Sequence, residues 1–143
     1  MASHRTVLLA VCEPALQDSL GFALRRRGYH VLSALDGDRA AELSGRHLPD
    51  VAVVELLLPG RSGFQVAQLL KERSDGRVPM LMLAKFGAAA QQDYAASLGI
   101  ERFLTLPVLP RSITASVEDL CPLPPASRLM GSEFIPWAAA IPT

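Results

Sequence analysis

The sequence predicts an α/β fold in which a parallel sheet is covered by helices on both faces. Three observations support this: apolar runs of strand length, stretches between them with apolar residues at helical spacing, and short connections rich in Gly, Pro and Asp. A run that is apolar throughout is typical of a strand buried on both faces. Because the alternation continues through five rounds, we expect one doubly wound domain.

The first two strand and helix pairs show this pattern most clearly. Thr6–Val11 is continuously apolar, and Pro14 after it is tolerated in the first turn of a helix. Apolar residues then recur at helical spacing until Arg25-Arg26-Arg27-Gly28, where cations and a glycine are typical of a helix end. The cycle repeats with a strand at Tyr29–Ala34 and a short helix at Gly37–Ser44.

The other pairs follow in the same order. Asp50–Leu58 is the third apolar run and ends in the turn pair Pro59-Gly60. Ser62 is a suitable N-cap for a helix over Gly63–Arg73, whose apolar residues lie on one side. The last expected elements are a strand at Val78–Leu83, a helix at Ala88–Ser97, a strand at Arg102–Leu106 and a helix at Arg111–Leu120.

Five such pairs with short connections predict a flavodoxin-like (βα)5 fold, because parallel neighbours need right-handed crossovers. The expected strand order is 2-1-3-4-5, with residues 1–120 as the single domain and 121–143 as a Pro-rich C-terminal extension. The extension holds Phe134-Ile-Pro-Trp-Ala138, which has three interpretations: a motif that binds a partner, a segment that is self-docked or disordered, or vector-derived sequence after Gly131-Ser-Glu-Phe134. It is too short for a DNA-binding output domain, so we expect output by protein contact.

Composition excludes several classes of protein. Of 143 residues, 50% are hydrophobic, and 14 Lys and Arg balance 14 Asp and Glu, so a packed core is expected and a nucleic-acid-binding surface is not. No apolar stretch approaches the roughly 20 residues that cross a bilayer, and no secretory signal is apparent, which predicts a cytoplasmic protein. The distant Cys12 and Cys121 fit reduced thiols better than a disulfide or a zinc site. We expect no cofactor and no metal.

Ligands of such sheets bind beyond the carboxyl ends of the strands, near the point where the strand order reverses. That edge is therefore where function is to be sought. The residues expected there are Val11, Cys12, Glu13, Glu55, Ala84, Lys85 and Leu106.

The residues at and between these strand ends resemble the receiver domain of two-component response regulators, over about residues 5–120. The matches, at the family's spacing, are Glu13-Pro14, Gly28-Tyr29-x-Val31, Gly37, Pro49-Asp50, Leu58-Pro59-Gly60-x-x-Gly63, Pro79, Gly99, Phe103-Leu104 and Pro107. The resemblance implies a bacterial-type signalling or phosphorelay domain that takes a phosphoryl group on an aspartate ending the third strand. It also implies an acidic pair after the first strand that helps to hold Mg²⁺, a Thr or Ser ending the fourth, and a Lys before the proline of the fifth.

The chain departs from the family at each of these positions. Val11 and Cys12 occupy the acidic pair, Glu55 the phosphoacceptor position, Ala84 the hydroxyl position and Leu106 the lysine position. Too few hard oxygen ligands are left for Mg²⁺, and little is left to stabilise a transferred phosphoryl group. We therefore expect a pseudo-receiver that is not an enzyme. Sliding the first strand by one residue would place Cys12-Glu13 on the acidic pair, but Pro14 argues against that register.

Four side chains near this edge are notable, and Glu55 and Lys85 among them each have two interpretations. Glu55 either mimics a permanently activated state or has drifted after activity was lost. Lys85 either closes the old pocket in an ion pair with Glu55, or extends into water while Glu55 is solvated or bonded to backbone N–H groups. Glu13 is an acidic residue retained near the pocket. Phe103 stands at the family's switch aromatic and, lacking a hydroxyl, favours inward packing.

Three functions remain possible at this stage. The first is a phosphorylation-independent adaptor that binds a protein partner, or a second copy of itself, through the face that the resemblance assigns to the last two helices and the last strand. Its candidate contact residues are Gln91, Gln92 and Tyr94, on a helix that is nearly uncharged, together with Arg102 on the last strand and Arg111 on the last helix. The second is a divergent phosphoacceptor. The third is a small-ligand sensor that uses the vacated pocket near Val11, Cys12, Ala84 and Leu106.

Overall fold

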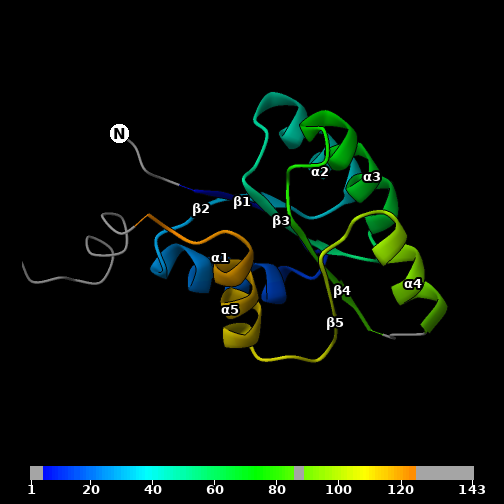
Figure 1. Cartoon of the computed structure of the whole chain (residues 1–143). Helices are drawn as coiled ribbons and strands as arrows, with labels where there is room; N and C mark the ends of the chain where they lie inside the picture. The colour runs from blue at the N-terminus through cyan, green and yellow to red at the C-terminus, as the bar shows by residue number, and fades with distance from the viewer. Residues whose placement is uncertain (1–4, 86–88, 125–143) are drawn as a thin grey trace, which may run out of the picture.

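The computed structural model describes residues 5–85 and 89–124 as five strands that alternate with five helices (Figure 1). The strands are β1 Thr6–Ala10, β2 His30–Ala34, β3 Val51–Glu55, β4 Met80–Ala84 and β5 Arg102–Thr105. The helices are α1 Pro14–Arg26, α2 Gly37–Arg46, α3 Gly63–Ser74, α4 Ala89–Ser97 and α5 Pro110–Leu120. Within the described residues, no helix is both long and apolar enough to span a bilayer.

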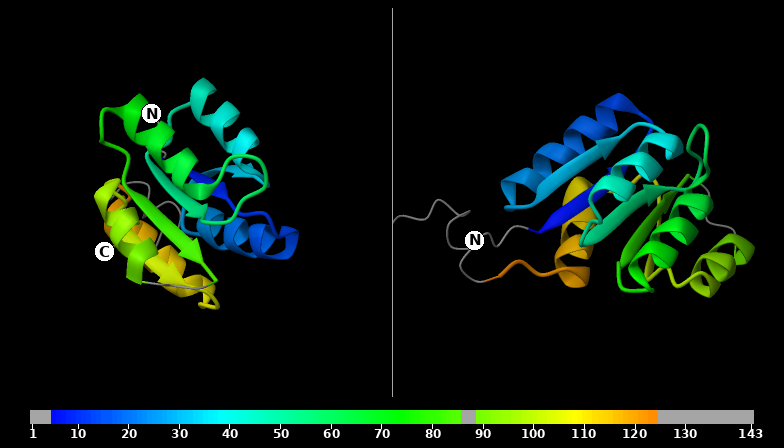
Figure 2. Two further views of the ribbon diagram at one scale, coloured as in Figure 1. Left: turned by 90° about the vertical axis from the view of Figure 1, so that its right-hand side faces the viewer. Right: turned by 90° about the horizontal axis from the view of Figure 1, so that it is seen from above.

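The sheet is parallel, with the strand order β2-β1-β3-β4-β5, so the predicted flavodoxin-like fold is confirmed. Helices α1 and α5 cover one face and α2, α3 and α4 cover the other (Figures 1 and 2). Both faces are therefore dry, which explains why β1, β3 and β4 are buried at every residue.

A hydrophobic cluster lies on each side of the sheet, because successive strand residues point to opposite faces. Leu8 and Val54 belong to the cluster under α2, α3 and α4, whereas Leu9 and Val53 belong to the cluster under α1 and α5. Cys121 and Leu123 are buried in the second cluster, and the hydroxyl of Tyr29 donates a 2.6 Å hydrogen bond to the carbonyl of Cys121. The packed core thus continues past the expected boundary at residue 120.

Some element ends differ from the predicted ones. The apolar run continues to Leu58, whereas β3 ends at Glu55, because the chain turns there toward α3 and the N–H of Gly63 donates to the carbonyl of Leu56 at 2.8 Å. Leu56 and Leu58 stay buried although they lie in the loop, which explains the longer apolar run. The expected start of α4, Ala88, lies outside the described residues.

The turn into α3 positions the site. Ser62 caps the helix as predicted: its hydroxyl accepts from the N–H of Gln65 at 3.2 Å, and the Gln65 side chain accepts from the N–H of Ser62 at 2.9 Å. A Cβ on Gly63 would lie 2.8 Å from Cα of Leu56 and would also meet the carbonyl of Glu55. The glycine therefore lets α3 begin directly against the end of β3.

Candidate functional site

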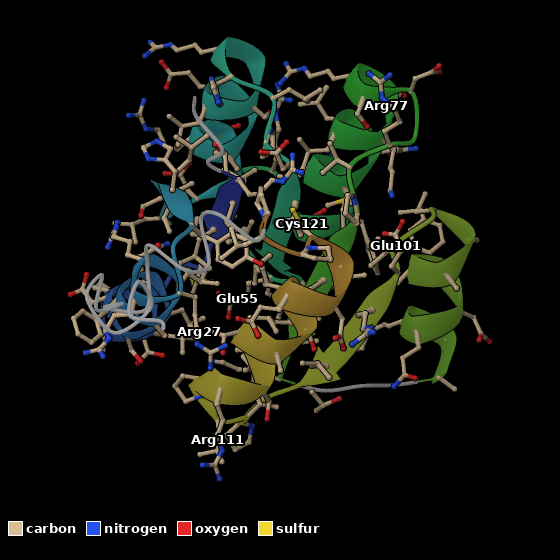
Figure 3. All side chains as sticks on the ribbon, turned by 60° about the vertical axis from the view of Figure 1, so that its left-hand side comes forward. Arg27, Glu55, Arg77, Glu101, Arg111 and Cys121 are labelled. Atoms are coloured by element: carbon tan, nitrogen blue, oxygen red, sulfur yellow. The ribbon has the colours of Figure 1, made fainter. Side chains whose placement is uncertain are left out.

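Glu55 is the last residue of β3 and is 5% exposed. Its Oε1 atom accepts a 3.0 Å hydrogen bond from the backbone N–H of Cys12, at the end of the neighbouring β1. The carboxylate is thus held by the main chain across the two central strands, and Figure 3 shows it within the body of the domain. This is the backbone-bonded alternative considered from the sequence.

The two acidic-pair positions have different environments. Val11 is fully buried in the cluster under α1 and α5, and its N–H donates to the carbonyl of Ala34. Cys12 is half-buried with a free thiol, and its Sγ lies 4.0 Å from the carbonyl oxygen of Leu57. Burial, and secondarily the nearby carboxylate of Glu55, raises the pKa of the Cys12 thiol, so this position presents a neutral group.

Glu13 is exposed and lies at the N-cap of α1, where its side chain makes no capping hydrogen bond. Glu13 comes after the end of β1, and the residue whose N–H bonds to Glu55 is Cys12. Glu13 thus lies one residue beyond the N–H that bonds to Glu55, at the start of α1.

Ala84 and Leu106 lie together at the ends of the next two strands. Ala84 is 2% exposed, and its carbonyl accepts a 2.7 Å hydrogen bond from the N–H of Leu106. Leu106 is half-buried and packs against the cluster under α1 and α5. Neither side chain brings a hydroxyl or a cation to the site.

Of the two alternatives for Lys85, the structure shows the one without an ion pair to Glu55. Lys85 is exposed, and the ion pairs within 4.0 Å among the described residues do not include it. Lys85 directly follows the end of β4, and the carboxylate of Glu55 is bonded to the N–H of Cys12.

These residues do not fit the magnesium ion that the resemblance implies. A magnesium site needs several oxygen ligands in near-octahedral geometry. At these strand ends the buried carboxylate of Glu55 lies beside an apolar Val11 and a neutral thiol at Cys12, while Glu13 is exposed at the start of α1. In residues 5–85 and 89–124, no group of three or more His, Cys, Asp or Glu side chains is arranged to hold a metal ion.

The candidate contact residues lie on two different faces. Tyr94 is 48% exposed, and its ring meets that of Phe64 on α3 edge-on, with the ring centroids 4.7 Å apart and the planes at 89°. Tyr94 therefore packs one edge against α3 and leaves about half of its surface exposed. Phe103 is half-buried and packs against the cluster under α2, α3 and α4, in agreement with the expected inward packing.

The remaining candidates are Gln91, Gln92, Arg102 and Arg111. Gln91 and Arg102 are half-buried, while Gln92 and Arg111 are exposed. Nη1 of Arg102 lies 3.3 Å from Oδ2 of Asp119, which joins β5 to α5. Figure 3 shows Arg111 projecting from α5.

Comparison with known proteins agrees with this architecture. The family model of the response regulator receiver domain matches residues 7–118. The chain belongs to the response regulator receiver domain family. This chain is 30% identical over 117 residues to the probable transcriptional regulator ycf27 of Guillardia theta, and the match covers 82% of this chain. The chain spans only 45% of that relative's length.

Solved structures of receiver domains share the fold. A CheY-like receiver domain protein of Methanospirillum hungatei superposes with a TM-score of 0.77 at 18% identity, covering 82% of this chain and 93% of that one. The chemotaxis protein CheY4 of Vibrio cholerae superposes with a TM-score of 0.76 at 20% identity, covering 82% and 98%. At this level of identity the likeness concerns the fold alone.

One residue that supports the receiver site was missed in the sequence. Gln17 on α1 is buried, and its Nε2 donates to the carbonyls of Leu9, Val11 and Ala34 at 3.1, 3.1 and 2.9 Å. It therefore fixes the end of β1 against β2. The sequence did offer a signal: Gln17 stands three residues before the apolar Leu20, and residues at that spacing lie on the same face of a helix.

Proposed function

We propose that this receiver domain is a phosphorylation-independent signalling module that acts by binding a protein partner. The observation that supports this most is the hydrogen bond from Cys12 to the buried Glu55, at the position where the family takes its phosphoryl group. A carboxylate that is buried and bonded to the main chain is a poor nucleophile, and Ala84 and Leu106 bring neither a hydroxyl nor a cation to it. Phosphoryl transfer depends on positioning and charge neutralisation, and these residues supply neither.

The proposed contact surface lies on β5 and α5 with the adjoining side of α4. Arg102 and Arg111 provide positive charge there, while α4 has no charged residue in its first or last turn. A weakly charged surface with Arg at its border is typical of a protein interface. The partner is a protein of a signalling pathway or a second copy of the chain. The sequence identity with a probable transcriptional regulator is compatible with either.

Two measurements test the proposal. The purified chain is incubated with Mg²⁺ and acetyl phosphate and its intact mass is recorded; we expect no change, and an adduct of one phosphate would contradict phosphorylation independence.

Sedimentation and capture of native partners are then compared between the wild type and the double variant Arg102→Glu, Arg111→Glu. We expect the variant to lose the association. The control is Arg39→Glu, which changes an exposed arginine on α2. This helix contacts β2, the edge strand opposite β5. If the control disrupts association as strongly as the double variant, the assigned surface is wrong.

A further inference from the structure

A second site lies beside the former phosphorylation site. A cavity of about 420 Å³ is lined by Glu13, Leu16, Lys85, Leu106, Pro107 and Val108. Its volume falls within the range of about 300–1,000 Å³ that is usual for small-molecule sites. The vacated pocket expected from the sequence would have used Val11, Cys12 and Ala84, but these residues do not line the cavity, and Val11 and Ala84 are sealed in the core.

The floor of the cavity is apolar and firmly held. Leu16, Leu106 and Val108 are partly buried and pack against the cluster under α1 and α5. The hydrogen bond of 2.7 Å from the N–H of Leu106 to the carbonyl of Ala84 fixes the loop after β5. Leu106 stands where the family has a lysine, so this part of the cavity lining favours an apolar group.

Two opposite charges lie on the lining of the same cavity. Glu13 and Lys85 are both exposed, and they are not paired with each other within 4.0 Å. Neither side chain makes a hydrogen bond or an ion pair with another residue of the described ranges. One carboxylate and one ammonium above an apolar floor match a ligand that carries both charges and an apolar body.

We propose that this cavity binds a small amphipathic zwitterion of the type of an apolar α-amino acid. Lys85 binds the ligand's carboxylate, Glu13 binds its ammonium group, and the apolar side chain packs on Leu16, Leu106 and Val108. The residues that line the cavity do not include Arg102 or Arg111 of the proposed protein-binding surface.

Isothermal titration calorimetry on the full chain tests this with five probes: leucine, phenylalanine, glycine, 4-methylpentanoate and 3-methylbutylamine. We expect leucine or phenylalanine to bind, and expect each of the three truncated probes to bind at least about tenfold more weakly, the loss that follows removal of a charge-assisted contact or of the apolar body. Absence of binding by both amino acids, or equal binding by the carboxylate or amine alone, would overturn the proposal.

Three variants locate the site. Lys85→Met and Glu13→Gln each remove one charge and should weaken leucine or phenylalanine binding at least about tenfold. Leu106→Trp should abolish it by filling the cavity.

Arg61→Met and Leu57→Trp are the controls. They change an exposed cation and an exposed leucine at the same edge of the sheet, and neither residue lines the cavity. Thermal denaturation without ligand shows that each variant is folded. Binding that survives Leu106→Trp, or that is lost equally in the controls, would place the ligand elsewhere.

Discussion

The backbone N–H of Cys12 and the Oε1 atom of Glu55 are joined by a 3.0 Å hydrogen bond that links the ends of β1 and β3. In an active receiver the corresponding carboxylate must face a phosphodonor and a metal ion. In this chain it faces the main chain and a neutral thiol. The bond therefore gives Glu55 a structural role and determines what its substitution will do.

Restoring aspartate at position 55 should not restore phosphorylation. The shorter Asp side chain would resemble the family's phosphoacceptor, but Val11, Ala84 and Leu106 would still lack the ligands, hydroxyl and lysine that act together with it. We expect Glu55→Asp to remain unmodified after incubation with Mg²⁺ and acetyl phosphate, as judged by intact mass. A phosphate adduct that appears only when Mg²⁺ is present would contradict this prediction.

Lys85 and Glu55 should be energetically independent. They form no ion pair in the structure, and any long-range attraction between them is screened because Lys85 is exposed. In a double-mutant cycle with Lys85→Met and Glu55→Gln, measured by urea denaturation, we expect a coupling energy below about 0.5 kcal/mol. A coupling well above that value would show that the two charges meet in solution.

Cys12 should react slowly with alkylating reagents, and Glu55 should contribute to this. Burial raises the pKa of the Cys12 thiol and the carboxylate of Glu55 raises it further, so little thiolate is present near pH 7.5. Iodoacetamide should therefore modify Cys12 more slowly than it modifies an unfolded-peptide cysteine, and Glu55→Gln should increase the rate. The measurement uses a Cys121→Ser background, because the pKa of the Cys121 thiol is also raised by burial.

The same pKa shift has a consequence for stability. Folding favours the protonated thiol of Cys12, so its contribution to the free energy of unfolding is fully present below the unfolded pKa of about 8.5. The contribution is lost as the pH rises through the higher pKa of the folded protein. Glu55→Gln should therefore reduce the fall in stability between pH 8 and pH 10; an unchanged slope would show that Glu55 does not act on this thiol.

The fold could be predicted because the signals in the sequence were local and agreed with one another. The apolar run Thr6–Val11, the capping residue Ser62 and the turn at Pro59-Gly60 each specify their own element, and the strand order follows from the crossover rule. The apolar run that continues past the end of β3 shows the limit of such signals. Leu56 and Leu58 are buried as loop residues, and a hydrophobic pattern does not distinguish burial in a loop from burial in a strand.

The site was predicted in its membership but not in its contacts. The predicted strand ends place Glu55, Cys12 and Ala84 at one edge of the sheet. The sequence did not determine which group would donate a hydrogen bond to Glu55. A backbone N–H is present at every non-proline residue, whereas only a charged side chain such as Lys85 stands out in a sequence. Likewise, Tyr94 was placed on the correct helix, but its orientation toward Phe64 depends on how α3 and α4 pack.

Gln17 should be essential for stability, because its side chain is buried and donates to three main-chain carbonyls, those of Leu9, Val11 and Ala34. Gln17→Met keeps the volume and removes the donors, and we expect it to lower the free energy of unfolding by about 1–3 kcal/mol. Gln68→Met, at an exposed position of α3, is the matched control and should change stability by less than about 0.5 kcal/mol.

Gln17→Glu separates donation from simple packing. A carboxylate facing three carbonyl oxygens repels them, whereas its protonated form donates one hydrogen bond, so burial at this position would raise the pKa of the new group. A group with a raised pKa contributes stability below its unfolded pKa and loses it as the pH rises. Urea denaturation should therefore show a larger loss relative to wild type at pH 7 than at pH 4. An equal loss at both pH values would mean that Gln17 acts through its volume and that the three hydrogen bonds contribute little.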